Sequence, residues 1–106
     1  MSNIHKDELG DTHIATLKVE QGIEGSEDRE PYPLTGLDLA VFWRELSGEQ
    51  KVERAIVSRD DAEGVVTVVI AASHPSSSHK DAEYRLRATD GKGHVNTLAI
   101  WRVKRG

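Results

Sequence analysis

The sequence contains no cysteine and only three prolines among its 106 residues. Disulfide bonds, thiolate nucleophiles and cysteine-ligated metal sites are therefore excluded. No apolar run approaches the ~20 residues that a membrane-spanning helix needs. The first residues also lack the apolar stretch of a secretory signal. We therefore expect a protein without a membrane partner that is made in a cytosol.

Excess positive charge is also missing. The chain has 14 Lys+Arg against 18 Asp+Glu, a net charge of -4. This balance lacks the basic footprint of nucleic-acid-binding proteins, so we expect no nucleic-acid partner. The small basic end formed by Arg102, Lys104 and Arg105 is predicted to be a solvated tail. The length suits one domain, which we place at residues 11–106 after a flexible segment at residues 1–10.

The main pattern in the sequence is an alternation of apolar and polar residues. Residues 84–89 and 95–103 alternate on either side of a Gly-rich turn at residues 90–93, which is typical of a β-hairpin. Further strands are predicted at residues 12–20, 37–44, 52–58 and 65–72, with an exposed loop at 21–30, a polar turn at 47–51 and a loop at 73–82. This rhythm predicts an all-β fold, an immunoglobulin-like antiparallel β-sandwich of about six to seven strands.

The hairpin permits a prediction of strand register. Pairing Ala88 with Val95 and Tyr84 with Ala99 keeps the arginines at positions 85 and 87 out of the core. The predicted inward set is Tyr84, Leu86, Ala88, Val95, Ala99, Trp101 and Val103. Leu98 and Ile100 then point outward.

Several predicted strands are apolar on both faces, and such strands need cover on both sides. The chain looks too small to supply two layers, so we expect a protein partner to cover part of this surface. The candidate interface residues are Phe42, Val65, Val69, Leu98 and Ile100. The alternative, left open here, is that the loops at residues 21–33 and 73–82 or an opposed sheet cover them.

Signatures of catalysis and metal binding are weak. The five histidines stand without cysteine or a metal-ligand spacing, and the acidic turn around Asp60 lacks the alternating calcium pattern. Serines at positions 76–78 lie near His74 and His79, but no nucleophile elbow accompanies them. We expect solvated histidines, no enzyme activity, no catalytic residues, no metal and no cofactor.

The tryptophans share parity with the core, so we expect Trp43 and Trp101 to be buried. Tyr32, between two prolines, is the more plausible exposed aromatic residue. This leaves open an alternative function, a carbohydrate- or surface-binding β-sandwich module that uses Tyr32 or the loop at residues 73–82.

Short turn motifs recur in an informative order. Gly10-Asp11-Thr12 opens the first strand, Leu34-Thr35-Gly36 precedes the second, and Tyr84-Arg85-Leu86-Arg87-Ala88-Thr89-Asp90-Gly91 forms the last hairpin. This order resembles the immunoglobulin-like N-terminal domain of phage baseplate upper proteins and related small virion proteins of tailed phages.

The resemblance implies a non-enzymatic structural protein of a tailed-phage particle: a tail, baseplate or neck component, or a subunit decorating the capsid. It also implies contacts with other capsid, neck or tail proteins, a homo-oligomer, and a final location in the virion after synthesis in the host cytoplasm. The family has no catalytic residues to transfer to this chain.

Overall fold

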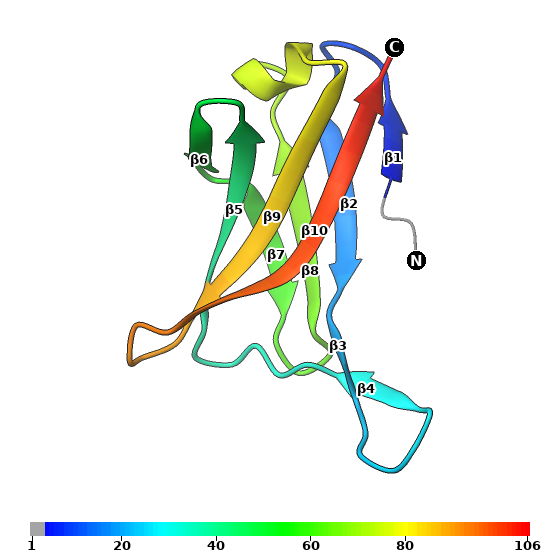
Figure 1. Ribbon diagram of the computed structural model, residues 1–106, viewed down its shortest axis with the longest axis vertical. Helices are drawn as coiled ribbons and strands as arrows, with labels where there is room; N and C mark the ends of the chain where they lie inside the picture. Colours follow the sequence, from blue (N-terminus) through cyan, green and yellow to red (C-terminus); the bar gives the residue numbers. More distant parts are fainter. Residues whose placement is uncertain (1–3) are drawn as a thin grey trace.

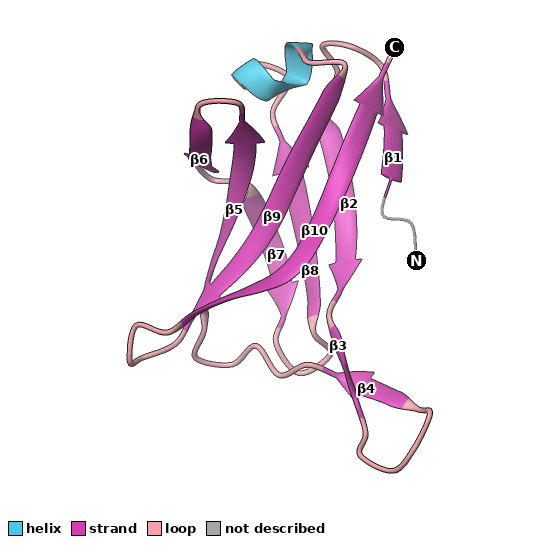
Figure 2. Cartoon of the chain, in the orientation of Figure 1, coloured by secondary structure: helices cyan, strands magenta, loops and turns pink. Residues whose placement is uncertain are grey.

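The computed structural model describes residues 4–106 and shows two β-sheets packed face to face (Figures 1 and 2). The larger sheet contains, in spatial order, β1 (Ile4–Asp7), β10 (Val95–Arg105), β9 (Asp81–Thr89), β5 (Asp38–Glu45) and β6 (Gly48–Val52). The smaller sheet contains β2 (His13–Lys18), β8 (Val65–Ile70) and β7 (Ile56–Asp60). A separate pair consists of β3 (Glu20–Gly22) and β4 (Arg29–Pro31). Within the described range, the single helical element is a 3₁₀ turn at Pro75–Ser78.

The fold class is an all-β, immunoglobulin-like sandwich, as predicted. The strands pair antiparallel except at one edge, where β1 runs parallel to β10. The three-stranded sheet β2–β8–β7 faces a sheet in which β9 lies between β5 and β10, which is the strand arrangement of this class. The described residues form ten strand segments rather than six to seven, because short pairings at the edges were not predicted.

The core lies between the inner faces of the two sheets. Every second residue of β8 and β9 is buried, as the period of a strand requires. The largest enclosed apolar side chains are Leu34, Val41, Trp43, Val66, Val68, Ile70, Tyr84, Leu86, Trp101 and Val103. Fully burying a Val, Leu or Ile side chain stabilises the fold by roughly 1.5–3 kcal/mol. Each sheet covers the inner face of the other, so an opposed sheet supplies one of the two covering layers that the two-faced strands require. The need for a partner on the outer faces stays a prediction.

Three predictions for the edges of the domain differ from the structure. The polar turn predicted at residues 47–51 is strand β6, which pairs with β5. Polar residues form this strand because it lies at a sheet edge with an exposed side. The predicted flexible segment at residues 1–10 includes strand β1, so only residues 1–3 of that prediction lie outside the described residues. Arg105 is not in a solvated tail: it pairs with Asp7 in the sheet and is 4% exposed.

The register predicted for the last hairpin is also wrong. Val95 lies opposite Thr89, and a β-bulge between Thr97 and Ala99 shifts the remainder so that Trp101 lies opposite Tyr84. A bulge inserts one extra residue, so the residues before it point to the opposite side of the sheet from the side that the alternation predicts. Val95 is therefore exposed. Leu98 packs against the core instead of pointing outward, while the rest of the predicted inward set is buried or half-buried.

The predicted loop at residues 21–30 is largely an arm built from β3 and β4, and it projects beyond one end of the sandwich (Figure 1). Its base is held by backbone bonds: Val19 N–H donates to the Gly64 carbonyl at 2.8 Å, and Tyr32 N–H donates to the Val19 carbonyl at 2.9 Å. Gly64 has φ +68, and a Cβ there would lie 2.5 Å from the Val19 carbonyl oxygen. Only glycine fits this junction without displacing backbone.

Candidate protein-binding surfaces

The outer face of the three-stranded sheet is mostly uncharged. Its outward residues by burial and register are Ile14, Thr16 and Lys18 of β2, Val65, Thr67 and Val69 of β8, and Ser58 and Asp60 of β7. Val57 lies where the register between β7 and β8 shifts, and we include it with this face because it is exposed beside Ser58. We call this set the β2–β8–β7 face. Ile14 is 64% exposed and Val57 is 57% exposed. β-Branched side chains thus cover most of this face, and charge is confined to one end.

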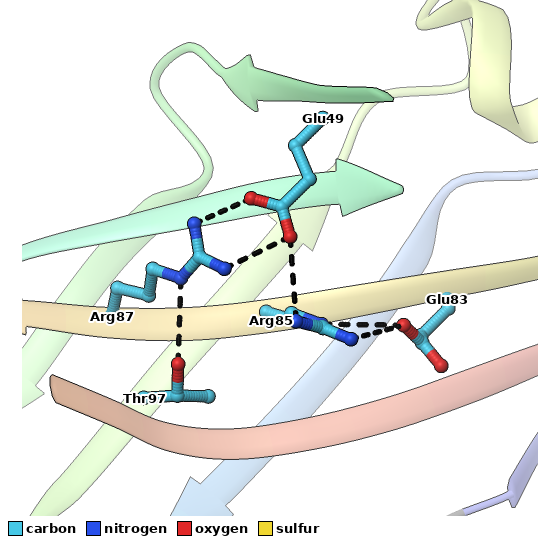
Figure 3. Close-up of polar contacts among 5 residues, drawn as sticks. All are labelled: Glu49, Glu83, Arg85, Arg87 and Thr97. Atoms are coloured by element: carbon cyan, nitrogen blue, oxygen red, sulfur yellow. Dashed lines mark hydrogen bonds and ion pairs between the residues drawn. The ribbon is translucent and has the colours of Figure 1, made fainter. Parts of the chain in front are cut away.

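The outer face of the five-stranded sheet has the opposite chemistry (Figure 3). Glu49 of β6 accepts two bonds from the Arg87 guanidinium of β9, one of them from Nη2 at 2.9 Å. Glu49 Oε1 also lies 3.4 Å from Arg85 Nη1, and Arg85 Nη2 donates to Glu83 Oε2 at 3.1 Å. Glu49 is therefore paired with two arginines of a neighbouring strand, and one of these arginines is also paired with Glu83 of its own strand.

Phe42 is covered by this ion-pair network. It lies on the outer side of β5, with the Arg87 guanidinium carbon 5.0 Å from its ring centroid. A cation over an aromatic face is attractive and removes that face from water. Phe42 and Ile100 both lie opposite Arg85 in the sheet, one on each side. These two apolar residues are thus separated by an ion-paired arginine.

The five predicted interface residues do not form one patch. Val65 and Val69 lie on the β2–β8–β7 face, whereas Phe42 and Ile100 lie on the other side of the sandwich. Leu98 packs against the core. Sequence reasoning missed Ile14 and Val57, the most exposed apolar members of the β2–β8–β7 face. Ile14 interrupts the alternation of its strand, and an apolar residue at a solvent-facing position was the available sign.

A buried polar cluster closes the end of the sandwich opposite the arm. Arg105 Nη2 donates to the Tyr84 hydroxyl at 2.9 Å, and Arg105 Nη1 donates to the Ser76 carbonyl at 2.9 Å. The Tyr84 hydroxyl donates to Ser76 Oγ at 2.7 Å. The 3₁₀ turn is thereby tied to β9 and to the last residues of β10. We assign this cluster a structural role.

The serine–histidine loop has the same role. Ser76 Oγ lies 2.7 Å from His74 Nδ1, and His74 also caps the 3₁₀ turn by accepting from Ser76 N–H. Ser76 is 0% exposed and is turned toward Tyr84, so its hydroxyl is not placed to attack a substrate. A nucleophilic serine must be reachable by the carbonyl that it attacks.

His13 is buried rather than solvated, which corrects the prediction for isolated histidines. Its Nε2 accepts a bond from Trp101 Nε1–H at 3.2 Å, so Nδ1 carries the proton and donates to Asp7 Oδ2 at 2.6 Å. Burial lowers the pKa of His13 below 6.5, although the adjacent Asp7 carboxylate acts in the opposite direction. Burial likewise lowers the pKa of His74. Both groups favour the neutral imidazole in the folded protein.

The aromatic residues considered for carbohydrate binding are held against the core. Tyr32 is half-buried and packs on core side chains. Trp43 is 2% exposed, with the rings of His74 and His79 at 5.5 and 4.9 Å in edge-on contacts. Trp43 contributes to a groove of about 620 Å³ beside the β5–β6 turn, but the ring does not present an open face there. Carbohydrate binding stays a prediction without a specific observation in its favour.

Within residues 4–106, no group of three or more His, Asp or Glu side chains is arranged to hold a metal ion. No helix in the same range has the length and apolar character to cross a membrane. No model of a known protein family and no curated protein matches this sequence.

Proposed function

We propose that this chain is a non-enzymatic structural protein of a tailed-phage particle and acts through protein–protein contacts. The observation that carries the contact role is the contrast between the two outer sheet faces. The five-stranded sheet carries a network of paired charges, whereas the β2–β8–β7 face exposes Ile14 and Val57 and has charges only at the end formed by Lys18 and Asp60. A surface on which exposed apolar side chains outnumber charges is suited to docking.

The assignment to a phage particle is supported by the turn motifs that resemble small virion proteins. The fold gives those motifs structural roles. Gly10 and Gly36 adopt φ +80 and +79 just before β2 and β5, and Leu34 is fully buried. Asp90 Oδ1 accepts from the Lys92 and His94 amides in the hairpin turn.

The contact role is tested by replacing Ile14 and Val57 together with serine. We expect loss of binding to the partner subunits while the monomer remains folded, because both side chains are exposed. Replacing the equally exposed Val95 with serine serves as the control, since it lies outside this face. Equal binding by the wild type, the Ile14→Ser/Val57→Ser variant and the Val95→Ser control would contradict the proposal.

The particle assignment is tested on tailed particles purified from the source culture by density gradient. Mass spectrometry should detect this chain in stoichiometric amounts in the particle band. Its absence from intact particles would overturn the virion role.

A further inference from the structure

One end of the β2–β8–β7 face carries its only charges, and they are arranged in a row. Lys18 lies directly opposite Val65, and Asp60 lies opposite Val65 on the other side. Neighbouring strands are about 4.8 Å apart, so the two charged residues are separated by roughly 10 Å across the sheet. The other rows contain Ile14 beside Val69, and Thr16, Thr67 and Ser58.

Neither charge forms an ion pair within the part of the chain that the structure describes. Lys18 forms no ion pair there, and the neighbouring Arg59 pairs with Asp61 rather than with Asp60. Asp60 accepts one bond from the backbone of its own turn, from Glu63 N–H at 3.2 Å. The row thus offers one cation and one anion on opposite sides of Val65.

We propose that the β2–β8–β7 face binds the same face of a second copy of this chain, about a two-fold axis that runs along β8. This inference rests on the proposed contact role of the face. The axis places β8 opposite β8 and β2 opposite β7 of the other copy. Lys18 of each copy then meets Asp60 of the other, which gives two ion pairs from one row of residues.

The apolar residues match in the same arrangement. The axis brings the β2 edge carrying Ile14 over the β7 edge carrying Val57, at both sides of the pair. A two-fold axis across the strands would instead lay the charged row over the row of Ile14 and Val69, which would bury charges against apolar side chains. Two sheets packed face to face lie about 10 Å apart with nearly aligned strands, a spacing that lysine and aspartate side chains can span.

The size of the face sets the strength of the association. Three strands about 4.8 Å apart and about six residues long cover roughly 300 Å² of flat sheet. Stable interfaces bury about 800 Å² from each partner. We therefore expect a weak pair, with a dissociation constant on the order of 0.1 mM, that forms where many copies are concentrated in one assembly.

Charge exchange tests the pairing. Sedimentation equilibrium between about 10 µM and about 1 mM should show wild-type mass rising toward that of a dimer. Lys18→Glu alone and Asp60→Lys alone should each remain monomeric, because like charges then face each other. An equimolar mixture of the two variants should regain the dimer, since every facing pair is again of opposite charge. The double variant Lys18→Glu/Asp60→Lys should dimerise by itself for the same reason.

Lys51→Glu is the matched control, because it makes the same change of charge on the outer side of β6. It should dimerise like wild type. A wild-type protein that is monomeric at about 1 mM overturns the inference. So does a mixture of the single variants that associates no better than either variant alone.

The outcome also separates this inference from the proposed function. Suppose that the Ile14→Ser/Val57→Ser protein is lost from particles while the wild-type chain never self-associates. The contact role then holds, and the partner is a different protein. A dimer that responds to charge exchange, formed by a chain absent from particles, supports the pairing and overturns the virion role.

Discussion

His13 connects three parts of the fold through one imidazole ring. Its two nitrogens contact Trp101 of β10 and Asp7 of β1, and its ring stacks on Tyr84 with 6.0 Å between centroids. Protonation at Nε2 would point an N–H at the Trp101 N–H, and one hydrogen bond would be lost. The ring is 1% exposed, so water cannot replace that bond.

We expect the protein to lose stability as the pH falls below about 6.5, the ordinary pKa of histidine. Burial lowers the pKa of His13 and of His74 in the folded state, so the unfolded chain binds protons first. Above that pH the contribution is constant. Urea unfolding at a series of pH values measures this dependence.

His13→Gln should reduce the dependence, because the glutamine amide can accept from Trp101 and donate to Asp7 but does not titrate. His74 remains in this variant, so a smaller pH effect of the same sign should persist. Identical pH dependence in the variant and the wild type would contradict this role of His13.

At the scale of elements, the junction around Gly64 holds three segments together. The end of β2, the Tyr32 backbone and the turn before β8 meet there through the bonds of Val19. A Cβ at position 64 would lie 2.5 Å from the Val19 carbonyl and 2.9 Å from the Tyr32 carbonyl. Both obstacles are backbone, which cannot rotate away as a side chain can.

Gly64→Ala should therefore lower the free energy of unfolding by about 2 kcal/mol or more, because positive φ and a backbone clash act together. Gly91→Ala is the control, since nothing lies within 4 Å of a Cβ there. We expect a change of no more than about 0.5 kcal/mol at Gly91. Chemical denaturation of the two variants measures the difference, and equal losses would contradict the role of the junction.

The elements also show which strands the sequence predicts and which it does not. The strands predicted at residues 37–44 and 65–72 correspond to β5 and β8, because β-branched and aromatic residues dominate the middle of both runs. Strand β6 could not be predicted, because its exposed polar residues gain their conformation from pairing with β5. The bulge at Leu98 was equally hidden, since one inserted residue leaves no compositional mark.

The candidate site was predicted less well than the fold. Val65 and Val69 were identified, but Phe42 was given to the same surface because periodicity assigns a residue to a side of a strand and not to a sheet. Which strands share a sheet depends on long-range pairing. Arg87 above Phe42 comes from such a pairing between β5 and β9.

At the scale of the whole molecule, the arm is a separate feature from the sandwich. Residues 22–30 are all exposed, and the arm projects away from both sheets (Figure 1). Its bonds are mostly internal, such as the 3.1 Å bond from Gln21 Nε2 to Glu30 Oε1. The core described above contains no residue from its tip.

Replacing residues 23–28 with Asn-Gly should leave the melting temperature within about 3 °C of the wild type. The tip buries nothing, and Gly22 already lies opposite Arg29, so a two-residue turn can close the same strands. Thermal unfolding followed by circular dichroism measures this. A drop of about 8 °C or more would show that the arm stabilises the body.

The direction of the arm has a consequence for the proposed pair. A two-fold axis along β8 preserves the direction of the strands, so the arms of both copies project from the same end of the pair. Each arm carries four acidic residues against one arginine in residues 21–30. The two arms together concentrate negative potential at one end of the pair. This potential would attract a cationic surface to that end rather than to the opposite end, which Arg105 closes.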